Sequence, residues 1–143
     1  MASQFILTRR VAFSETDLAG IVHFSNFYRY MEDAEHAFYR SLGFSVHPHE
    51  ANIGWPRIKT ECEFRLPLRF EEEFEVEVTV AEVRTKSVRH RFQFWKRDPR
   101  ELAAVGEMVV VCVKFGDKMR AVPIPDEWRA KLQLAVERES VEG

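Results

Sequence analysis

Hydrophobic and polar positions alternate with a period of two along much of the chain. The first alternating segment runs from Phe5 to Phe13, and three more follow at residues 58–65, 73–80 and 88–94. Residues 103–115 are almost continuously apolar, which is typical of a central strand with both faces covered. The pattern therefore predicts one strand near the start of the chain and four strands in its second half.

The period changes between residues 26 and 42, where apolar side chains recur at steps of three and four. This spacing predicts an amphipathic helix. Ser25 or Asn26 can cap the start of the helix, and Gly43 fits just past its end. A second, short helix is expected to begin at Asp126. The apolar face of the first helix consists of Phe27, Tyr30, Met31, Ala34, Ala37 and Phe38.

The order of the predicted elements is strand, helix and then four strands. Consecutive strands joined by short turns pair in antiparallel fashion, and the long amphipathic helix is available to cover the apolar face of their sheet. We therefore expect the α+β class: an antiparallel sheet of about five strands wrapped around one long helix, plus a short C-terminal helix. Nothing in the composition marks a linker, so residues 1–143 are expected to form a single domain.

The composition of the chain argues against several classes of protein. The chain has 143 residues, of which 45% are hydrophobic and 31% charged, so it has enough apolar residues for a folded core. Its net charge of −2 argues against nucleic-acid binding, and no apolar run is long enough to cross a membrane. Cys62 and Cys112 lack a partner spacing and are expected to be free thiols, which favours a cytoplasmic location. His47 and His49 are expected to form a surface pair rather than a metal site, and no cofactor motif is present.

The loop before the first helix carries the clearest candidate chemistry. Asp17 lies nine residues ahead of the helix start, and Gly20 permits a close approach of the backbone. A helix N-terminus offers free backbone N–H groups, so a carboxylate beside it suits attack on an activated carbonyl. The alternative is that the acid is a cap or a solvated turn residue. Glu15 is expected to be solvated.

Residues 11–43, VAFSETDLAGIVHFSNFYRYMEDAEHAFYRSLG, resemble the opening segment of a known enzyme family. The pattern is an Asp, two residues, a Gly, an apolar pair, an aromatic residue or His, an Asn and an aromatic residue, followed by a helix bearing an acid, here Glu32. It is similar to the hotdog-fold acyl-CoA thioesterases of the 4-hydroxybenzoyl-CoA thioesterase-like family. The resemblance implies hydrolysis of an acyl-CoA thioester to free acid and coenzyme A. It also implies a homodimer or homotetramer with the active site between subunits.

The same resemblance assigns a role to each matching position. Asp17 matches the catalytic carboxylate, which acts as nucleophile or general base, and the backbone N–H of Phe24 matches the group that polarises the thioester carbonyl. Gly20 lets the loop fit close to the thioester. His23 either orients water or substrate or is a spacer at the edge of the pocket. Asn26 is a candidate for substrate contact, although a capping role is favoured.

The coenzyme A end of the substrate requires cations for its phosphates. The segment 83–100 is rich in Arg and Lys, and within it Lys86 and Ser87 resemble a family position near the site. Arg89 is a further candidate, but these arginines can instead neutralise the acidic strand at residues 71–77. Candidates for lining the acyl pocket, each of which can equally be simple core packing, are Phe27, Tyr30, Met31, Trp55 and Phe64.

Three other functions remain open on the same fold. One is a thioesterase for acyl carrier proteins, and another is a non-catalytic acyl-CoA-binding protein, which would not need Asp17. The third is a dehydratase acting on 3-hydroxyacyl thioesters. His23 and Phe24 are followed by Ser25 rather than Pro, which departs from the pattern that dehydratases show.

Overall fold

The computed structural model describes the backbone of residues 5–46 and 52–142, and the side chains as far as residue 136. In chain order the elements are β1 (Phe5–Arg10), a short 3₁₀ helix (Phe13–Glu15), α1 (Asn26–Ser41), β2 (Ile53–Gly54), β3 (Arg57–Phe64), β4 (Glu73–Val83), β5 (Ser87–Lys96), β6 (Glu101–Val111), β7 (Val113–Lys114), β8 (Arg120–Ala121) and α2 (Asp126–Glu142).

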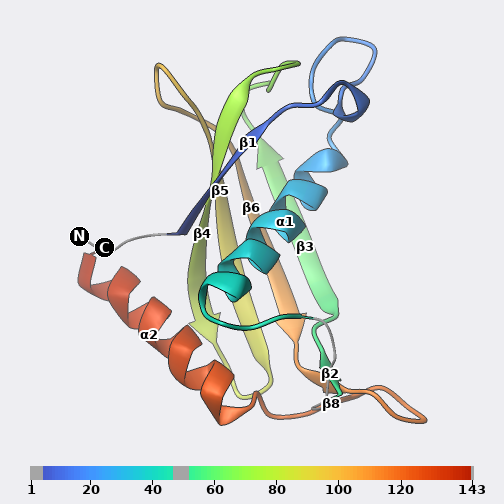
Figure 1. Cartoon of the computed structure of the whole chain (residues 1–143), viewed down its shortest axis with the longest axis vertical. Helices are drawn as coiled ribbons and strands as arrows, with labels where there is room; N and C mark the ends of the chain where they lie inside the picture. The colour runs from blue at the N-terminus through green and yellow to red at the C-terminus, as the bar shows by residue number, and fades with distance from the viewer. Residues whose placement is uncertain (1–4, 47–51, 143) are drawn as a thin grey trace.

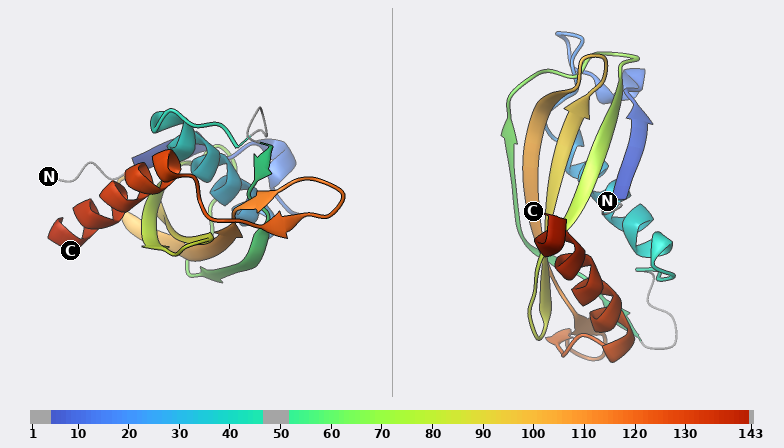
Figure 2. Two further views of the ribbon diagram at one scale, coloured as in Figure 1. Left: turned by 90° about the horizontal axis from the view of Figure 1, so that it is seen from below. Right: turned by 90° about the vertical axis from the view of Figure 1, so that its left-hand side faces the viewer.

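The main sheet has five antiparallel strands in the order β1-β4-β5-β6-β3. It curves around α1, which lies across its concave side, as Figure 1 and the two views of Figure 2 show. The prediction of an α+β hotdog architecture, with an antiparallel sheet wrapped around one long helix, is confirmed.

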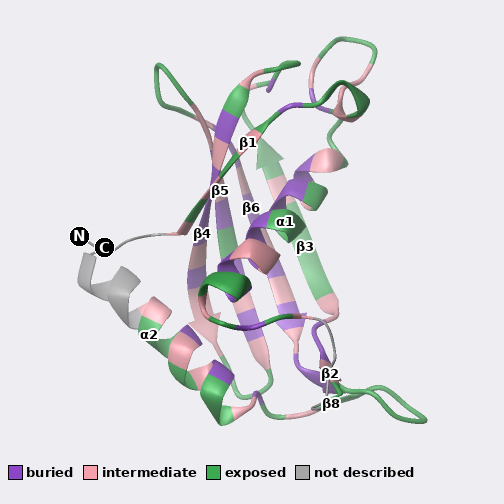
Figure 3. Ribbon diagram, in the orientation of Figure 1, coloured by how far each residue is buried: buried purple, intermediate pink, exposed green. Residues whose placement is uncertain are grey.

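The core lies between α1 and the sheet. The alternation in β4 places Phe74, Val76, Val78 and Val80 under the helix, where each is at most 3% exposed. Purple buried positions accordingly alternate with paler ones along the strands in Figure 3. Each fully buried apolar side chain of this size contributes roughly 1.5–3 kcal/mol, so this face fixes both the register and the position of α1.

The sequence pattern misassigned some exposed apolar residues to the core. β1 ends at Arg10, and Phe13 belongs to the 3₁₀ helix, where it is 77% exposed. Ile58 and Phe64 of β3 are 67% and 47% exposed. They are uncovered because β3 is the last strand of the sheet, while α1 packs mainly over β4 and β1.

The second half of the chain contains more elements than the pattern predicted. The expected strand at 103–115 breaks at Cys112, and its last part, β7, joins a small sheet in the order β2-β7-β8. These strands have two residues each, which is too short for alternation to reveal them. α2 runs over 17 residues and is therefore not the short helix expected. None of the helices in the described ranges is both long and apolar enough to span a membrane.

The two ends of the main sheet carry different structures (Figure 1). At one end lies the loop between β1 and α1, which contacts the connection between β3 and β4. At the other end lie α2, the small sheet and the turn between β4 and β5. The Thr85 carbonyl in that turn accepts a hydrogen bond from the Ile124 N–H at 2.9 Å.

Candidate active site

Asp17 lies in a tight turn that holds one of its carboxylate oxygens. Its Oδ1 accepts a hydrogen bond from the Ala19 N–H at 2.8 Å, and its own N–H donates to the Ile21 carbonyl at 2.8 Å. Gly20 has a φ of +80°, a conformation that glycine adopts without strain, which explains why a glycine stands here. Within the described part of the chain, Oδ2 has no hydrogen-bond partner. That oxygen is therefore available to react.

Backbone contacts fasten this loop to the sheet. The Val22 N–H donates to the Leu68 carbonyl at 2.8 Å, and Ile21 forms a bridge with Arg69. Both partners belong to the segment that leads into β4. The loop is therefore held at its C-terminal side by a neighbour that is distant in sequence.

The start of α1 leaves one backbone donor free beside the loop. The N–H groups of Asn26 and Phe27 donate to the carbonyls of His23 and Phe24 at 2.9 and 3.2 Å, and the Ser25 N–H points to the His23 ring. The Phe24 N–H has no partner in the described residues. Ser25 occupies the N-cap position but makes no side-chain cap, and Asn26 does not cap either, so the predicted cap is wrong.

The ring of His23 is oriented by Ser25. Its Nδ1 lies 2.8 Å from the Ser25 Oγ and 3.3 Å from the Ser25 backbone nitrogen. In the tautomer in which Nδ1 accepts from the Ser25 N–H, the ring carries its hydrogen on Nε2. The ring stacks on the exposed Phe24 ring with centroids 4.7 Å apart. His23 therefore presents an N–H donor at the surface beside the start of α1.

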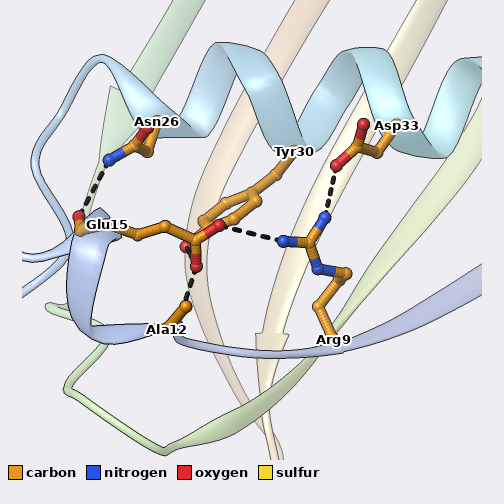
Figure 4. A network of polar contacts seen from close by, with 6 residues as sticks. All are labelled: Arg9, Ala12, Glu15, Asn26, Tyr30 and Asp33. Carbon is orange, nitrogen blue, oxygen red and sulfur yellow. Dashed lines mark hydrogen bonds and ion pairs between the residues drawn. The ribbon is translucent and has the colours of Figure 1, made fainter.

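Glu15 is not solvated, contrary to the expectation from sequence. Its side chain is 19% exposed. Oε1 accepts hydrogen bonds from the Ala12 N–H and the Tyr30 hydroxyl, each at 2.8 Å, and Oε2 pairs with Arg9 at 3.0 Å. Figure 4 shows this network, in which Arg9 also pairs with Asp33 of α1. Burial and the hydrogen bond to Glu15 raise the pKa of Tyr30 well above its ordinary value, so the hydroxyl is a permanent donor.

Asn26 joins the helix to the loop instead of facing an open pocket. Its Nδ2 donates to the Glu15 carbonyl at 2.8 Å, and the His23 N–H donates to the same carbonyl at 2.9 Å. The amide nitrogen of Asn26 therefore has a structural partner already.

The residues predicted to hold coenzyme A lie at the opposite end of the sheet from Asp17. Lys86 is in the turn between β4 and β5, and Ser87 and Arg89 begin β5. Arg89 pairs with Glu107 at 3.1 Å and lies 3.8 Å from Glu82, which are acids outside residues 71–77. The cations that do pair with the acidic strand at 71–77 are Lys96, Arg97 and Arg100. A single chain does not bring Lys86, Ser87 or Arg89 to Asp17.

The candidates for the acyl pocket lie in the core, with one exception. Phe27, Tyr30, Met31 and Trp55 are at most 8% exposed, which fits core packing, whereas Phe64 is 47% exposed. A separate open hollow lies on the sheet face turned away from α1. Its lining comes from β3, β5, β6 and the residue after β3: Glu61, Cys62, Glu63, Arg65, Arg91, Val105, Gly106 and Glu107.

Metal or thiol chemistry has no support at this site. Among the described residues, no group of three or more His, Cys, Asp or Glu side chains could hold a metal ion. His47 and His49 lie outside the described residues. Both cysteines are free, and burial raises the pKa of Cys62 to about 12, so its thiol is not an activated nucleophile.

A buried polar cluster in the other half of α1 escaped the sequence analysis. Glu35 is 1% exposed and pairs with Arg57 of β3 at 2.6 Å, while its Oε2 has no hydrogen-bond partner in the described structure. Burial raises the pKa of Glu35 to about 7, although Arg57 opposes the shift. One turn further along α1, the Tyr39 hydroxyl contacts the buried His90 ring. The sequence did carry a signal for this cluster, because Glu35 stands four positions before Tyr39 within the predicted helix, and residues at this spacing lie on the same face.

Comparison with known proteins shows which family the chain resembles. Residues 11–132 match the family model of the thioesterase-like superfamily. One relative is a protein of Aquifex aeolicus (strain VF5) that is named as an esterase. It is 36% identical over 120 residues, which cover 83% of this chain and 91% of that protein.

Two further relatives have named substrates. The 4-hydroxybenzoyl-CoA thioesterase of Pseudomonas sp. (strain CBS-3) is 22% identical over 136 residues, covering 90% of this chain and 96% of that protein. The solved structure of the gentisyl-coenzyme A thioesterase BH1999 is 32% identical and superposes with a TM-score of 0.78, covering 87% of this chain and 98% of that one.

Proposed function

The chain belongs to the thioesterase-like superfamily, and from this premise we propose that it hydrolyses an acyl-CoA thioester to the free acid and coenzyme A. The family and the enzyme class follow from the match over residues 11–132. The coenzyme A thioester is supported by relatives that are named for acyl-CoA substrates. Both of those acyl groups are aromatic, which makes an aromatic acyl group the first one to test.

One observation carries the proposed mechanism: the short loop before α1 carries both a carboxylate oxygen and a backbone N–H that have no hydrogen-bond partner among the residues that the structure describes. In the proposal the Phe24 N–H donates to the thioester carbonyl oxygen and stabilises the negative charge that develops there. Oδ2 of Asp17 then either attacks the carbonyl carbon or removes a proton from the attacking water. The thiolate of coenzyme A leaves in both routes. In the first route water then hydrolyses the anhydride between the acyl group and Asp17, and in the second the added water gives the free acid directly.

Three neighbouring residues complete the proposed site. Gly20 keeps the turn free of a side chain where the thioester approaches, and a Cβ there would meet no atom within 4 Å. The Nε2–H of His23 provides a donor for water or substrate. Asn26 acts through its hydrogen bond to the loop rather than through the substrate.

The coenzyme A phosphates are proposed to bind Lys86, Ser87 and Arg89 of a second copy of the chain. These residues and Asp17 lie at opposite ends of one sheet, so a site that uses both sets must form between two chains (Figure 1). Lys86 makes no ion pair within the described residues and is free to meet a phosphate. The proposed assembly is a homodimer or a homotetramer.

Replacing Asp17 by Asn tests the mechanism. We expect kcat for a panel of aromatic, short-chain and long-chain acyl-CoAs to fall by about 10²- to 10⁴-fold, the usual contribution of a catalytic acid or base. Binding of the intact acyl-CoA should persist, because the amide keeps the size of the carboxylate. Thiol release measures the first quantity and calorimetry the second.

The matched control is Asp117→Asn, which removes an exposed acid far from the loop. It should leave kcat unchanged. If Asp17→Asn hydrolyses the substrates at the wild-type rate, Asp17 is not the catalytic group. If wild-type protein binds acyl-CoA without releasing thiol, the non-catalytic binding alternative holds, and release from an acyl carrier protein alone would favour that substrate class.

A further inference from the structure

We propose that Glu15 is a positioning residue that holds the Asp17 loop against α1, so that the carboxylate and the Phe24 N–H keep their relative positions. The inference rests on the proposed function and extends it to a residue that does not touch the substrate. Glu15 lies two residues before Asp17, and its side chain takes part in a network with Ala12, Tyr30 and Arg9 (Figure 4).

The side chain of Glu15 connects three segments of the chain. Oε1 accepts from the Ala12 N–H, directly before the 3₁₀ helix, and from the Tyr30 hydroxyl on α1, each at 2.8 Å. Oε2 pairs with Arg9 of β1 at 3.0 Å. The bonds to Tyr30 and Arg9 are partly buried, whereas the bond from the Ala12 N–H is exposed. A carboxylate acceptor makes all of them stronger than bonds between neutral groups.

The backbone of Glu15 closes the loop. Its carbonyl accepts the His23 N–H at 2.9 Å and the Asn26 Nδ2 at 2.8 Å. Residue 15 stands before Asp17, while residues 23 and 26 stand after it at the start of α1. The Glu15 carbonyl therefore joins the two ends of the loop that carries the reacting groups, and the Glu15 side chain determines where that carbonyl lies.

Arg9 extends the network further along α1. It pairs with Asp33, and its guanidinium lies over the Tyr30 ring with 5.0 Å to the ring centroid. Tyr30 itself is fully buried. Glu15 is thus attached to the rigid part of the helix rather than to another mobile surface group.

A residue that only stabilises the fold, here called a structural brace, would change the melting temperature rather than kcat. The loop has independent attachments, from Val22 to Leu68 and from Ile21 to Arg69, so the fold does not depend on Glu15 alone. A brace would lower the melting temperature and leave kcat unchanged well below that temperature. A positioning residue lowers kcat at the same temperature, because a displacement of about 1 Å at the reacting groups costs on the order of 10²-fold in rate.

The test compares Glu15→Gln with wild-type protein at a temperature where both are folded. We expect kcat to fall by about 10- to 100-fold while KM changes little, because the substrate contacts remain. Tyr30→Phe, which removes a single hydrogen bond to Oε1, should lower kcat in the same direction by a smaller factor. If Glu15→Gln fails to fold, the kcat of Tyr30→Phe provides the test instead.

The matched control is Glu73→Gln. Glu73 pairs with Arg10 at 3.0 Å, the same separation as in the Glu15–Arg9 pair, but outside the network of Figure 4. This variant should retain wild-type kcat. The inference is wrong if Glu15→Gln and Tyr30→Phe both keep kcat within twofold of wild type, or if KM alone rises.

The two proposals fail in distinguishable ways. Absence of thiol release from wild-type protein contradicts the proposed function. Release by wild type that is lost in Asp17→Asn but fully kept in the Glu15 and Tyr30 variants contradicts only the positioning role.

Discussion

At the scale of single residues, three carboxylic acids near α1 show how surroundings set chemistry. Asp17 has one oxygen held in a turn and the other without a described partner. Glu15 has both oxygens bound by donors. Glu35 is buried, and its pKa is raised to about 7 by that burial. The first suits reaction, the second suits positioning, and the third titrates near neutral pH.

The titration of Glu35 predicts a pH dependence of stability. Because its pKa rises from 4.5 to about 7 on folding, the folded chain holds this proton more tightly than the unfolded chain. The stabilisation by neutral Glu35 is therefore complete below pH 4.5 and is lost as the pH rises through 7. Relative to wild type, Glu35→Gln should gain on the order of 2–3 kcal/mol in free energy of unfolding between pH 4.5 and pH 8.

Urea unfolding of both proteins at several pH values measures this difference. Burial lowers the pKa of His36 and that of His90, the latter to about 3, but both histidines are present in the two proteins and their contributions largely cancel. A difference between the two proteins that does not vary with pH would show that Glu35 keeps an ordinary pKa.

At the scale of elements, the Met31 side chain of α1 packs directly against Gly106 of β6. A Cβ at this position would lie 2.5 Å from the Met31 sulfur and 3.2 Å from the Glu61 carbonyl oxygen. Gly106→Ala should therefore destabilise the fold by about 1–3 kcal/mol through overpacking.

The double variant with Met31→Ala identifies the cause. If the clash with Met31 is responsible, the two changes together should cost less than the sum of their separate effects, by roughly 0.5–3 kcal/mol. Thermal unfolding of the four proteins in this cycle gives the coupling. Strict additivity would assign the cost to the β6 backbone instead.

The helices and strands also show how far the fold could be predicted from the sequence. The elements with long alternating or helical patterns, α1, β4 and β5 among them, lie where expected because burial on one face dictates their period. The small sheet and the end of β1 were missed, since their limits depend on pairing with distant segments. The exposure of Ile58 could not be predicted either, because alternation shows which residues share a face but not whether anything covers it.

The candidate site also has one part that the sequence predicted and one part that it did not. The Asp17 turn was predictable because Gly20 and the helix start are its neighbours in sequence. The role of Glu15 was not predictable, because its partners Arg9 and Tyr30 come from a strand and a helix whose relative placement is set by the whole fold.

At the scale of the whole molecule, the outer edge of β3 has no partner strand within the described residues. Ile58 and Phe64 on this strand are 67% and 47% exposed, and the unpaired backbone groups of an open edge strand favour pairing with another chain. We expect a homodimer that buries this edge, as the proposed site between two chains also requires.

Ile58→Lys tests the dimer. It should raise the dissociation constant at least about tenfold, because each copy loses roughly 1.5–3 kcal/mol of apolar burial. Light scattering after size-exclusion chromatography measures the mass, and thiol release should fall together with it. Leu134→Lys on α2, where Leu134 is 52% exposed, is the control and should leave the mass unchanged. A monomeric wild type with full activity would contradict the expectation.

The network in Figure 4 is drawn entirely from one uninterrupted stretch, Arg9 to Asp33. The proposed reacting groups, Asp17 and the Phe24 N–H, fall within the same stretch of sequence. Exchanging residues 9–33 between two relatives would therefore transfer the loop together with the contacts of Figure 4, while the attachments to Leu68 and Arg69 would come from the recipient chain.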